Sequence, residues 1–265
     1  MSKPSNPNDP VNGVTSTSHH DTYPFIAPTK NDFRSKHVFI TGASKGIGRA
    51  LATAYSRGGA SCIALSARSS LVEVVSECEA AAQEAGHPMP KVLIYAMDVV
   101  DRYGIERTAA EAAKDMDGRL DILVNNAGYL EVFKPIVDSD PDEWWKTWTV
   151  NIRGPYHVTR AFLPLMLRGG DKTIVNLSSI GAHRKRPGAS GYQTTKFAIA
   201  RFTEFIEAEY GEMGVIAFCV HPGGVMTELA ANMPLETHRS KLSLGKDRKA
   251  MEEDTTRLTT VMQCW

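Results

Sequence analysis

Short apolar runs alternate with longer amphipathic stretches over residues 37–220. Six apolar runs have the length and composition of buried strands: 37–40, 61–67, 91–97, 121–125, 173–178 and 215–220. They are apolar nearly throughout, which is typical of strands covered on both faces. Between them, apolar residues recur at three- and four-residue steps in 71–82 and 196–210, which predicts helices. The alternation predicts an α/β fold: a doubly wound parallel sheet with helices on both faces.

The two ends of the chain depart from this pattern. Residues 1–34 are rich in Ser, Thr, Asn and Pro, so we expect a disordered N-terminal extension in which only the patch at 23–26 can dock on the domain. The folded domain is expected to span 35–229. Residues 230–265 are polar and charged, and we interpret them as an atypical C-terminal tail.

Acidic and basic residues balance, at 30 Asp and Glu against 30 Lys and Arg, so the net charge is about zero. This balance argues against nucleic acid or an anionic membrane as a partner. No apolar run approaches the ~18–20 residues that span a bilayer, and the N-terminus lacks the apolar core of a signal peptide. We therefore expect a cytoplasmic protein without a membrane span. The four cysteines, Cys62, Cys78, Cys219 and Cys264, lack metal-binding spacing, so no metal site is predicted.

A glycine-rich turn, TGASKGIG at 41–48, follows the first predicted strand and precedes a helical run. The pyrophosphate of a dinucleotide needs a close backbone approach and the positive end of a helix dipole, and glycine permits that approach because it has no Cβ. The turn therefore predicts a dinucleotide site, with an ordinary strand–helix loop as the alternative. The residues assigned to it are Gly42, Ser44, Lys45, Gly46, Ile47 and Gly48.

The end of the second strand indicates which nucleotide is bound. An acidic residue there would bind the adenosine ribose hydroxyls and repel a 2′-phosphate. The strand ends instead in Ser66-Ala67-Arg68, and Arg68 can form charge-assisted hydrogen bonds to a 2′-phosphate, with Lys45 adding to them. The sequence thus favours NADP over NAD. In the alternative, Arg68 is a solvated loop cation.

Tyr192 and Lys196 are four residues apart at the start of a predicted helix, so their side chains share a face. A lysine cation beside a phenol favours the phenolate and is expected to lower the pKa of Tyr192, which would make it a usable acid and base. Ser179 ends the fifth strand at the carboxyl edge of the sheet and can bond the substrate oxygen that Tyr192 protonates. Taken singly, Tyr-x3-Lys occurs on helices by chance and Ser179 is an ordinary turn residue.

Seven motifs occur in one order along the chain: TGASKGIG at 41–48, Asp98 before Val99, NNAG at 125–128, Asn151, Ser179, YQTTK at 192–196 and PGGVMT at 222–227. In this order the chain resembles the short-chain dehydrogenase/reductase family in its short, single-domain form. The resemblance covers about residues 36–229 and implies a Rossmann-type fold that binds a nicotinamide dinucleotide.

The resemblance also implies roles for the matching residues. Asn151 would hold a water that links Lys196 to solvent and completes a proton relay with Tyr192, while Lys196 would also bind the nicotinamide ribose. The remaining matches would contact the cofactor: Asp98 the adenine, and Asn125, Ala127, Gly128, Pro222, Gly223, Val225 and Thr227 the rest of the dinucleotide. Strand-end and turn formation is the alternative for each of these.

Beyond Leu229 the resemblance fades. Members of the family continue with further helices and a last strand, whereas 230–265 hold no β-rich run, so the seventh strand is predicted to be missing. Because that strand often helps to build the family's oligomers, the expected homo-oligomer is in doubt. An exposed sixth strand would also favour aggregation.

The leading hypothesis is an NADP(H)-dependent enzyme that reduces a ketone or aldehyde, or oxidises the alcohol. We further interpret this enzyme as one of secondary metabolism. The alternatives are an NAD-dependent alcohol or steroid-type dehydrogenase and a catalytically impaired relative that only binds nucleotide. The expected partner is a small carbonyl or alcohol substrate, contacted by 129–133, 180–186 and the segment from Met226 onward. The basic run 183–186 is read first as a solvated loop. Trp144, Trp145 and Trp148 are read as core or interface packing.

Overall fold

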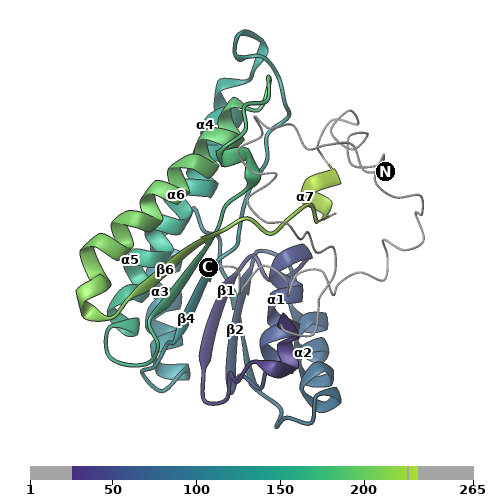
Figure 1. Cartoon of the computed structure of the whole chain (residues 1–265), viewed down its shortest axis with the longest axis vertical. Helices are drawn as coiled ribbons and strands as arrows, with labels where there is room; N and C mark the ends of the chain where they lie inside the picture. The colour runs from purple at the N-terminus through teal and green to yellow at the C-terminus, as the bar shows by residue number, and fades with distance from the viewer. Residues whose placement is uncertain (1–25, 226, 232–265) are drawn as a thin grey trace, which may run out of the picture.

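A parallel sheet forms the centre of the computed structural model, which describes residues 26–225 and 227–231 (Figure 1). In this part of the chain six strands lie in the order β3-β2-β1-β4-β5-β6. Their bounds are β1 His37–Thr41, β2 Cys62–Ala67, β3 Lys91–Ala96, β4 Ile122–Asn125, β5 Thr173–Leu177 and β6 Ile216–Val220. The predicted strands match these closely, and the predicted fold class is confirmed.

Helices cover both faces of the sheet, with α1 and α2 on one face and α3, α5 and α6 on the other (Figure 1). The α-helices are α1 Gly46–Arg57, α2 Val72–Glu84, α3 Arg102–Asp115, α4 Pro141–Trp148, α5 Gly154–Met166, α6 Ser190–Tyr210 and α7 Glu228–Ala231. A π-helical turn, Thr149–Arg153, joins α4 to α5. Short 3-10 turns lie at Pro28–Lys30, Ile136–Asp138, Ile180–Ala182 and Gly211–Met213.

Strand β1 shows how the sequence builds two cores. Val38 and Ile40 face α1 and α2, whereas Phe39 between them faces the opposite helices, because successive side chains of a strand point to opposite faces. All three are fully buried, and the rings of Phe39 and Phe162 of α5 have centroids 4.2 Å apart. Burying a side chain of this size contributes roughly 1.5–3 kcal/mol. The strand is therefore fixed from both sides.

Within the described residues, the two outermost strands differ from the prediction that every strand is covered on both faces. Residues of β1, β2 and β4 are almost all buried, but Ile94 in β3 and Ile216 in β6 are each 50% exposed. An edge strand has one neighbouring strand and fewer packed helices, which an apolar run in the sequence does not reveal.

Ordered structure begins earlier than the predicted domain boundary at residue 35. Ile26 is buried, and the ring of Phe33 packs edge-on against Tyr55 of α1, with centroids 4.9 Å apart. The remainder of the predicted N-terminal extension, 1–25, lies outside the described residues, as do 232–265 and with them the question of a seventh strand.

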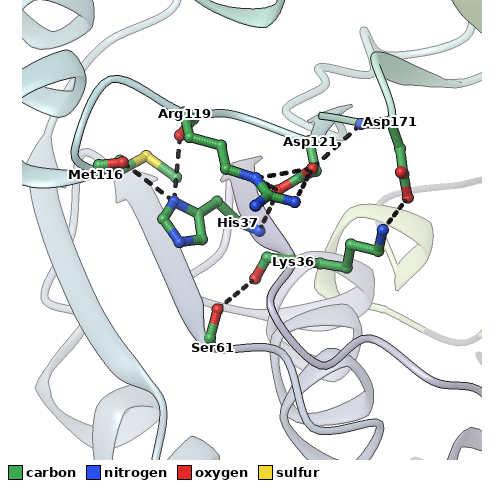
Figure 2. A network of polar contacts seen from close by, with 7 residues as sticks. All are labelled: Lys36, His37, Ser61, Met116, Arg119, Asp121 and Asp171. Carbon is green, nitrogen blue, oxygen red and sulfur yellow. Dashed lines mark hydrogen bonds and ion pairs between the residues drawn. The ribbon is translucent and has the colours of Figure 1, made fainter. Parts of the chain in front are cut away.

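A buried carboxylate joins the amino ends of three neighbouring strands (Figure 2). Asp121, just before β4, accepts hydrogen bonds from the backbone N–H of His37 in β1 at 2.8 Å and of Asp171 before β5 at 3.1 Å. The guanidinium of Arg119 donates two further hydrogen bonds to this carboxylate, from Nη2 to Oδ1 and from Nε to Oδ2, both at 2.9 Å. Burial opposes ionisation of Asp121, but these donors outweigh it and lower its pKa. This network lies at the amino ends of the strands, whereas the glycine-rich turn lies at their carboxyl ends.

Candidate active site

The glycine-rich turn leaves the carboxyl end of β1 and opens into the first turn of α1. Gly42 and Gly46 have positive φ angles, +66° and +56°, which favour glycine. A Cβ on Gly42 would lie 2.8 Å from the Cα of Ala127, and a Cβ on Gly48 would collide with the carbonyl oxygen of Gly42. The turn thus depends on bare backbone packed against the segment after β4.

Asn126 holds this turn in place, although the sequence assigned no role to it beyond its position in the NNAG motif. Its Nδ2 donates to the carbonyl oxygens of Thr41 at 2.9 Å and Gly42 at 3.0 Å. In return, the hydroxyl oxygen of Thr41 accepts from the backbone N–H groups of Asn126 at 3.0 Å and Ala127 at 3.1 Å. The carboxyl ends of β1 and β4 are therefore locked together at the predicted phosphate site.

The side chain of Asn125 is placed differently from its neighbour. It is buried inside the sheet, where Nδ2 donates to Oδ1 of Asn176 at 2.8 Å and to Oγ1 of Thr159 at 3.0 Å. Asn125 and Asn176 are register partners in β4 and β5. The alternation of side chains along a strand was the available signal that only one of the two asparagines reaches the glycine-rich turn.

Residues predicted to hold the adenosine end meet beside this turn. Arg68 is mostly exposed, and its Nη1 lies 3.8 Å from Oδ2 of Asp98. Oδ1 of Asp98 accepts from the backbone N–H of Val100 at 3.1 Å, so this carboxylate also forms a turn. The hydroxyl of Ser69 donates to Oγ of Ser44 at 2.8 Å. Together these residues connect the carboxyl ends of the first three strands.

The segment after β6 approaches the same turn. Nζ of Lys45 lies 2.6 Å from Oε2 of Glu228 in α7. The methyl carbon of Thr227 would be 3.2 Å from a Cβ on Gly46. Gly223 has φ +76° between the partly buried Pro222 and Val225. Met226 lies outside the described residues.

Tyr192 and Lys196 lie on the first turns of α6, and both are buried. Nζ of Lys196 is 5.5 Å from the centroid of the Tyr192 ring and donates to the carbonyl oxygen of Leu177 at 2.7 Å. Burial lowers the pKa of Lys196 to about 8. This helix begins at Ser190, earlier than its apolar pattern suggested.

The prediction that Lys196 lowers the pKa of Tyr192 is wrong for this arrangement. Burial of the phenol is the largest effect and raises its pKa, a hydrogen bond with Ser179 acts against it, and the negative charge of Glu131 adds to the rise. Lys196 is not among the groups that shift this pKa, and its ammonium donates to the Leu177 carbonyl. Tyr192 is therefore held in the protonated form.

Adjacent serines after β5 point to different partners. Oγ of Ser179 accepts from the backbone N–H of Gly181 at 3.0 Å and bonds with Tyr192. Oγ of Ser178 donates to the backbone carbonyl of Lys196 at 2.8 Å. Ser179 thus faces the phenol, while Ser178 fastens β5 to α6.

Asn151 occupies the π-helical turn between α4 and α5, a distortion that often marks functional sites. Its Oδ1 accepts from the backbone N–H of Tyr129 at 2.7 Å, and its Nδ2 donates to the Tyr129 carbonyl at 2.9 Å and to Oγ1 of Thr195 at 3.1 Å. A Cβ on Gly128 would lie 3.6 Å from Oδ1 of Asn151 and 4.0 Å from Nζ of Lys196. Asn151 therefore joins the segment after β4 to α6 beside the lysine.

A buried carboxylate, Glu131, lies in the segment proposed to contact substrate. Its Oε1 accepts from the backbone N–H of Tyr192 at 2.7 Å, and its Oε2 accepts from Oγ1 of Thr147 at 2.8 Å. The sequence gave no signal for this role because the first partner is 61 residues away. The residue lines a small cavity with Lys134, Asp140, Glu143, Trp144, Gly188 and Ser190.

The tryptophans of α4 are placed partly as expected. Trp144 and Trp148 pack together, with ring centroids 5.7 Å apart, but Trp145 is 63% exposed.

Among the described residues, no helix combines the length and apolarity needed to cross a bilayer. Nor does any group of three acidic, histidine or cysteine side chains in this part of the chain suit a metal ion.

Comparison with known proteins places this arrangement in a family. Residues 36–237 match the family model described as short chain dehydrogenase. The short chain dehydrogenase mpl6 of Monascus purpureus is 49% identical over 250 residues, which is 94% of this chain and 84% of the relative. The short chain dehydrogenase pigC of Monascus ruber is 42% identical over 252 residues, 95% of this chain and 83% of the relative.

Solved structures agree with this assignment. A short-chain type dehydrogenase/reductase from Mycobacterium ulcerans superposes with a TM-score of 0.71 at 26% identity, covering 80% of this chain and 74% of that one. An NAD+-bound xylitol dehydrogenase gives a TM-score of 0.62 at 29% identity, covering 72% of this chain and 70% of the other. The chain therefore belongs to the short chain dehydrogenase family of oxidoreductases.

Proposed function

We propose that this protein is an NADPH-dependent reductase of a ketone or aldehyde, in which Tyr192 donates the proton. One observation carries the proposal: Tyr192, Ser179 and Lys196 converge at the carboxyl edge of the sheet that also holds the glycine-rich turn. Ligands of open α/β sheets bind at this edge.

The residues at the glycine-rich turn fit a dinucleotide. Side chains are excluded at Gly42 and Gly48, and α1 begins directly behind the turn, so its N-terminal dipole is available to a pyrophosphate. Arg68, Ser44 and Lys45 would hold a 2′-phosphate. The exposed ion pairs of the two cations are each worth about 0–1 kcal/mol, so a phosphate can displace their carboxylates.

Other matching residues would hold the rest of the cofactor. Asp98 would contact the adenine, and Asn125 would act only from inside the sheet through Asn176. Lys196 would bind the nicotinamide ribose. The nicotinamide itself would rest against residues from the ends of β4 and β6: Ala127, Gly128, Pro222, Gly223, Val225 and Thr227.

A bound NADPH supplies the hydride that the protein itself lacks. The substrate oxygen would lie between the hydroxyls of Ser179 and Tyr192, and Tyr192 would give its proton to that oxygen. Asn151 would hold a water that links Lys196 to solvent, and through this relay a proton would return to Tyr192. Because burial raises the pKa of Tyr192, the phenol keeps its proton until the reaction, which suits reduction.

Two alternative functions can be distinguished from this one by experiment. An NAD-dependent alcohol or steroid-type dehydrogenase would keep the same proton donor, and xylitol dehydrogenase, a structural relative, has been solved with NAD+. A catalytically impaired relative would bind nucleotide without turnover. A cytoplasmic location, a homo-oligomeric state and a place in secondary metabolism stay predictions.

The test is a panel of ketones and aldehydes with NADPH and NADH in parallel, read as loss of reduced-nicotinamide absorbance. We expect turnover with NADPH in the wild type and a loss of about 100-fold or more in Tyr192→Phe, with an unchanged Kd for NADPH. The control is Tyr156→Phe, a half-exposed tyrosine of α5. Normal turnover in Tyr192→Phe contradicts the mechanism. Tight NADPH binding without turnover on any carbonyl favours the nucleotide-binding alternative.

A further inference from the structure

Helix α6, which carries Tyr192 and Lys196, has no cap from its own sequence. The first N–H groups of any helix lack partners within it, and a side chain of the preceding residue usually satisfies one of them. The residue before α6 is Ala189, whose methyl group accepts no hydrogen bond. The backbone N–H of Tyr192 instead donates to Oε1 of Glu131 at 2.7 Å. The cap is therefore supplied from the segment after β4.

Glu131 packs closely against the ends of two helices. A Cβ on Gly191 would lie 2.8 Å from Oε1, so only glycine lets the carboxylate reach the helix end. On the other side, Oγ1 of Thr147 in α4 donates to Oε2 at 2.8 Å. Nearby, Nε1 of Trp144 donates to Oγ of Ser190 at 3.3 Å, a second link between α4 and α6. The carboxylate thus ties the two helices together at the active site.

The charge of Glu131 is compensated by dipoles. The residue is 6% exposed, and its carboxylate accepts hydrogen bonds from a backbone N–H and a hydroxyl. A buried carboxylate in such a place is stabilised by the positive end of the helix that it caps. In the part of the chain that the structure describes, Glu131 and Lys196 are the charged groups beside Tyr192. The charge interaction with Cys219 of β6 raises the pKa of Lys196 and so opposes the effect of burial. The field of Glu131 adds to the burial that keeps Tyr192 protonated.

We propose that Glu131 is a positioning residue of the active site, which caps α6 from outside the helix and fixes Tyr192 against Ser179. The proposal rests on the function proposed above, because it assigns Tyr192 as the proton donor. It adds a residue whose hydrogen bonds go to the first turn of α6 and to α4, so that it acts on the reaction through the position of Tyr192.

Two variants separate the charge of Glu131 from its shape. Glu131→Gln keeps an acceptor oxygen for the Tyr192 N–H but removes the charge, whereas Glu131→Ala removes both. The matched control is Glu143→Gln, which neutralises a more exposed carboxylate beside the same cavity. Each protein is assayed for kcat and KM, for the pH dependence of kcat/KM with NADPH, and for amide hydrogen exchange over the first turn of α6.

We expect Glu131→Gln to move the alkaline limb of the kcat/KM profile to lower pH, because the phenol loses a neighbouring negative charge. Glu131→Ala is expected to lower kcat by about 10–100-fold with little change in the KM for NADPH, since a displaced donor misses the reacting geometry. Exchange in the first turn of α6 should rise in Glu131→Ala and stay at the wild-type level in Glu143→Gln.

Wild-type profiles and wild-type kcat in both Glu131 variants overturn the proposal, even if hydrogen exchange rises, because the residue is then merely structural. If Glu131→Ala does not fold, the profile of Glu131→Gln decides. If the wild type turns over no carbonyl, the proposed function fails, and unchanged exchange in the Glu131 variants then refutes the cap separately.

Discussion

The side-chain amide of Asn126 donates a hydrogen bond to the carbonyl oxygen of Gly42, with Nδ2 and the oxygen 3.0 Å apart. The bond joins the residue after β4 to the turn after β1, and a second bond to the Thr41 carbonyl reinforces it. The conformation of the glycine-rich turn therefore depends on a side chain that is distant in the sequence.

Removing this side chain is expected to weaken cofactor binding. Asn126→Ala leaves two turn carbonyls without their donor, and we expect a loss of about 1–2 kcal/mol, or roughly 5–30-fold in the Kd for NADPH. Fluorescence titration of NADPH measures it. Asn31→Ala is the control, since Asn31 belongs to the segment beside the opposite end of α1. Equal affinities for NADPH in all three proteins would contradict the proposed function of Asn126.

Arg68 is expected to set the preference between the two nicotinamide cofactors. A charge-assisted bond to a phosphate contributes about 1.5–3 kcal/mol, so Arg68→Ala should weaken NADPH binding by roughly 10–150-fold. NADH binding should change little, because NADH carries no 2′-phosphate. The control is Arg102→Ala, an exposed arginine of α3 paired with Glu106. An equal loss for NADPH and NADH would show that Arg68 does not read the phosphate.

Asp121 is expected to be a principal source of stability at the amino edge of the sheet. Asp121→Asn replaces an acceptor for several donors by an amide, and we expect the free energy of unfolding to fall by about 2–4 kcal/mol. The control Asp171→Asn breaks an ion pair with Lys36 in which Asp171 is half exposed, and should cost no more than about 1 kcal/mol. Urea unfolding of the three proteins measures both changes. Equal losses in the two variants would contradict the assignment.

The pH dependence of this contribution has a definite sign. The pKa of Asp121 is lowered in the folded protein, so the unfolded state takes up the proton first as the pH falls below the ordinary value of 3.8. The stabilisation by Asp121 is present above that pH and is lost as the pH falls further. The stability difference between wild type and Asp121→Asn should therefore narrow in acid, and a difference that widens would refute this account.

The buried ammonium of Lys196 is expected to lower the free energy of unfolding. Because burial lowers its pKa from 10.5 to about 8, the folded state releases the proton in a range where the unfolded state retains it. The ammonium is destabilising by about 3 kcal/mol below pH 8, and this effect fades as the pH rises toward 10.5. Lys196→Met should thus gain stability relative to wild type at pH 7 and lose that advantage at pH 10, as measured by urea unfolding. A constant difference across this range would contradict the shift.

Much of the fold was predictable from local pattern, because each central strand is a continuous apolar run and the turn after β1 is marked by its glycines. The order of motifs also indicated the family. What the pattern could not reveal depends on distant contacts. The partners of Asn126 and Glu131 come from other strands and helices. The raised pKa of Tyr192 depends on burial, which a four-residue spacing to Lys196 does not encode.

The amino ends and the carboxyl ends of the parallel strands form two borders of the sheet, and the two have different functions. The Asp121 network lies at the amino-terminal border of the sheet (Figure 2). The glycine-rich turn, Tyr192 and Lys196 lie at the carboxyl-terminal border. Selection can therefore act on the two borders separately. An engineer who seeks new substrates can reinforce the contacts around His37 and Asp121 first, and so gain tolerance for destabilising changes at the catalytic border without touching the residues that carry the reaction.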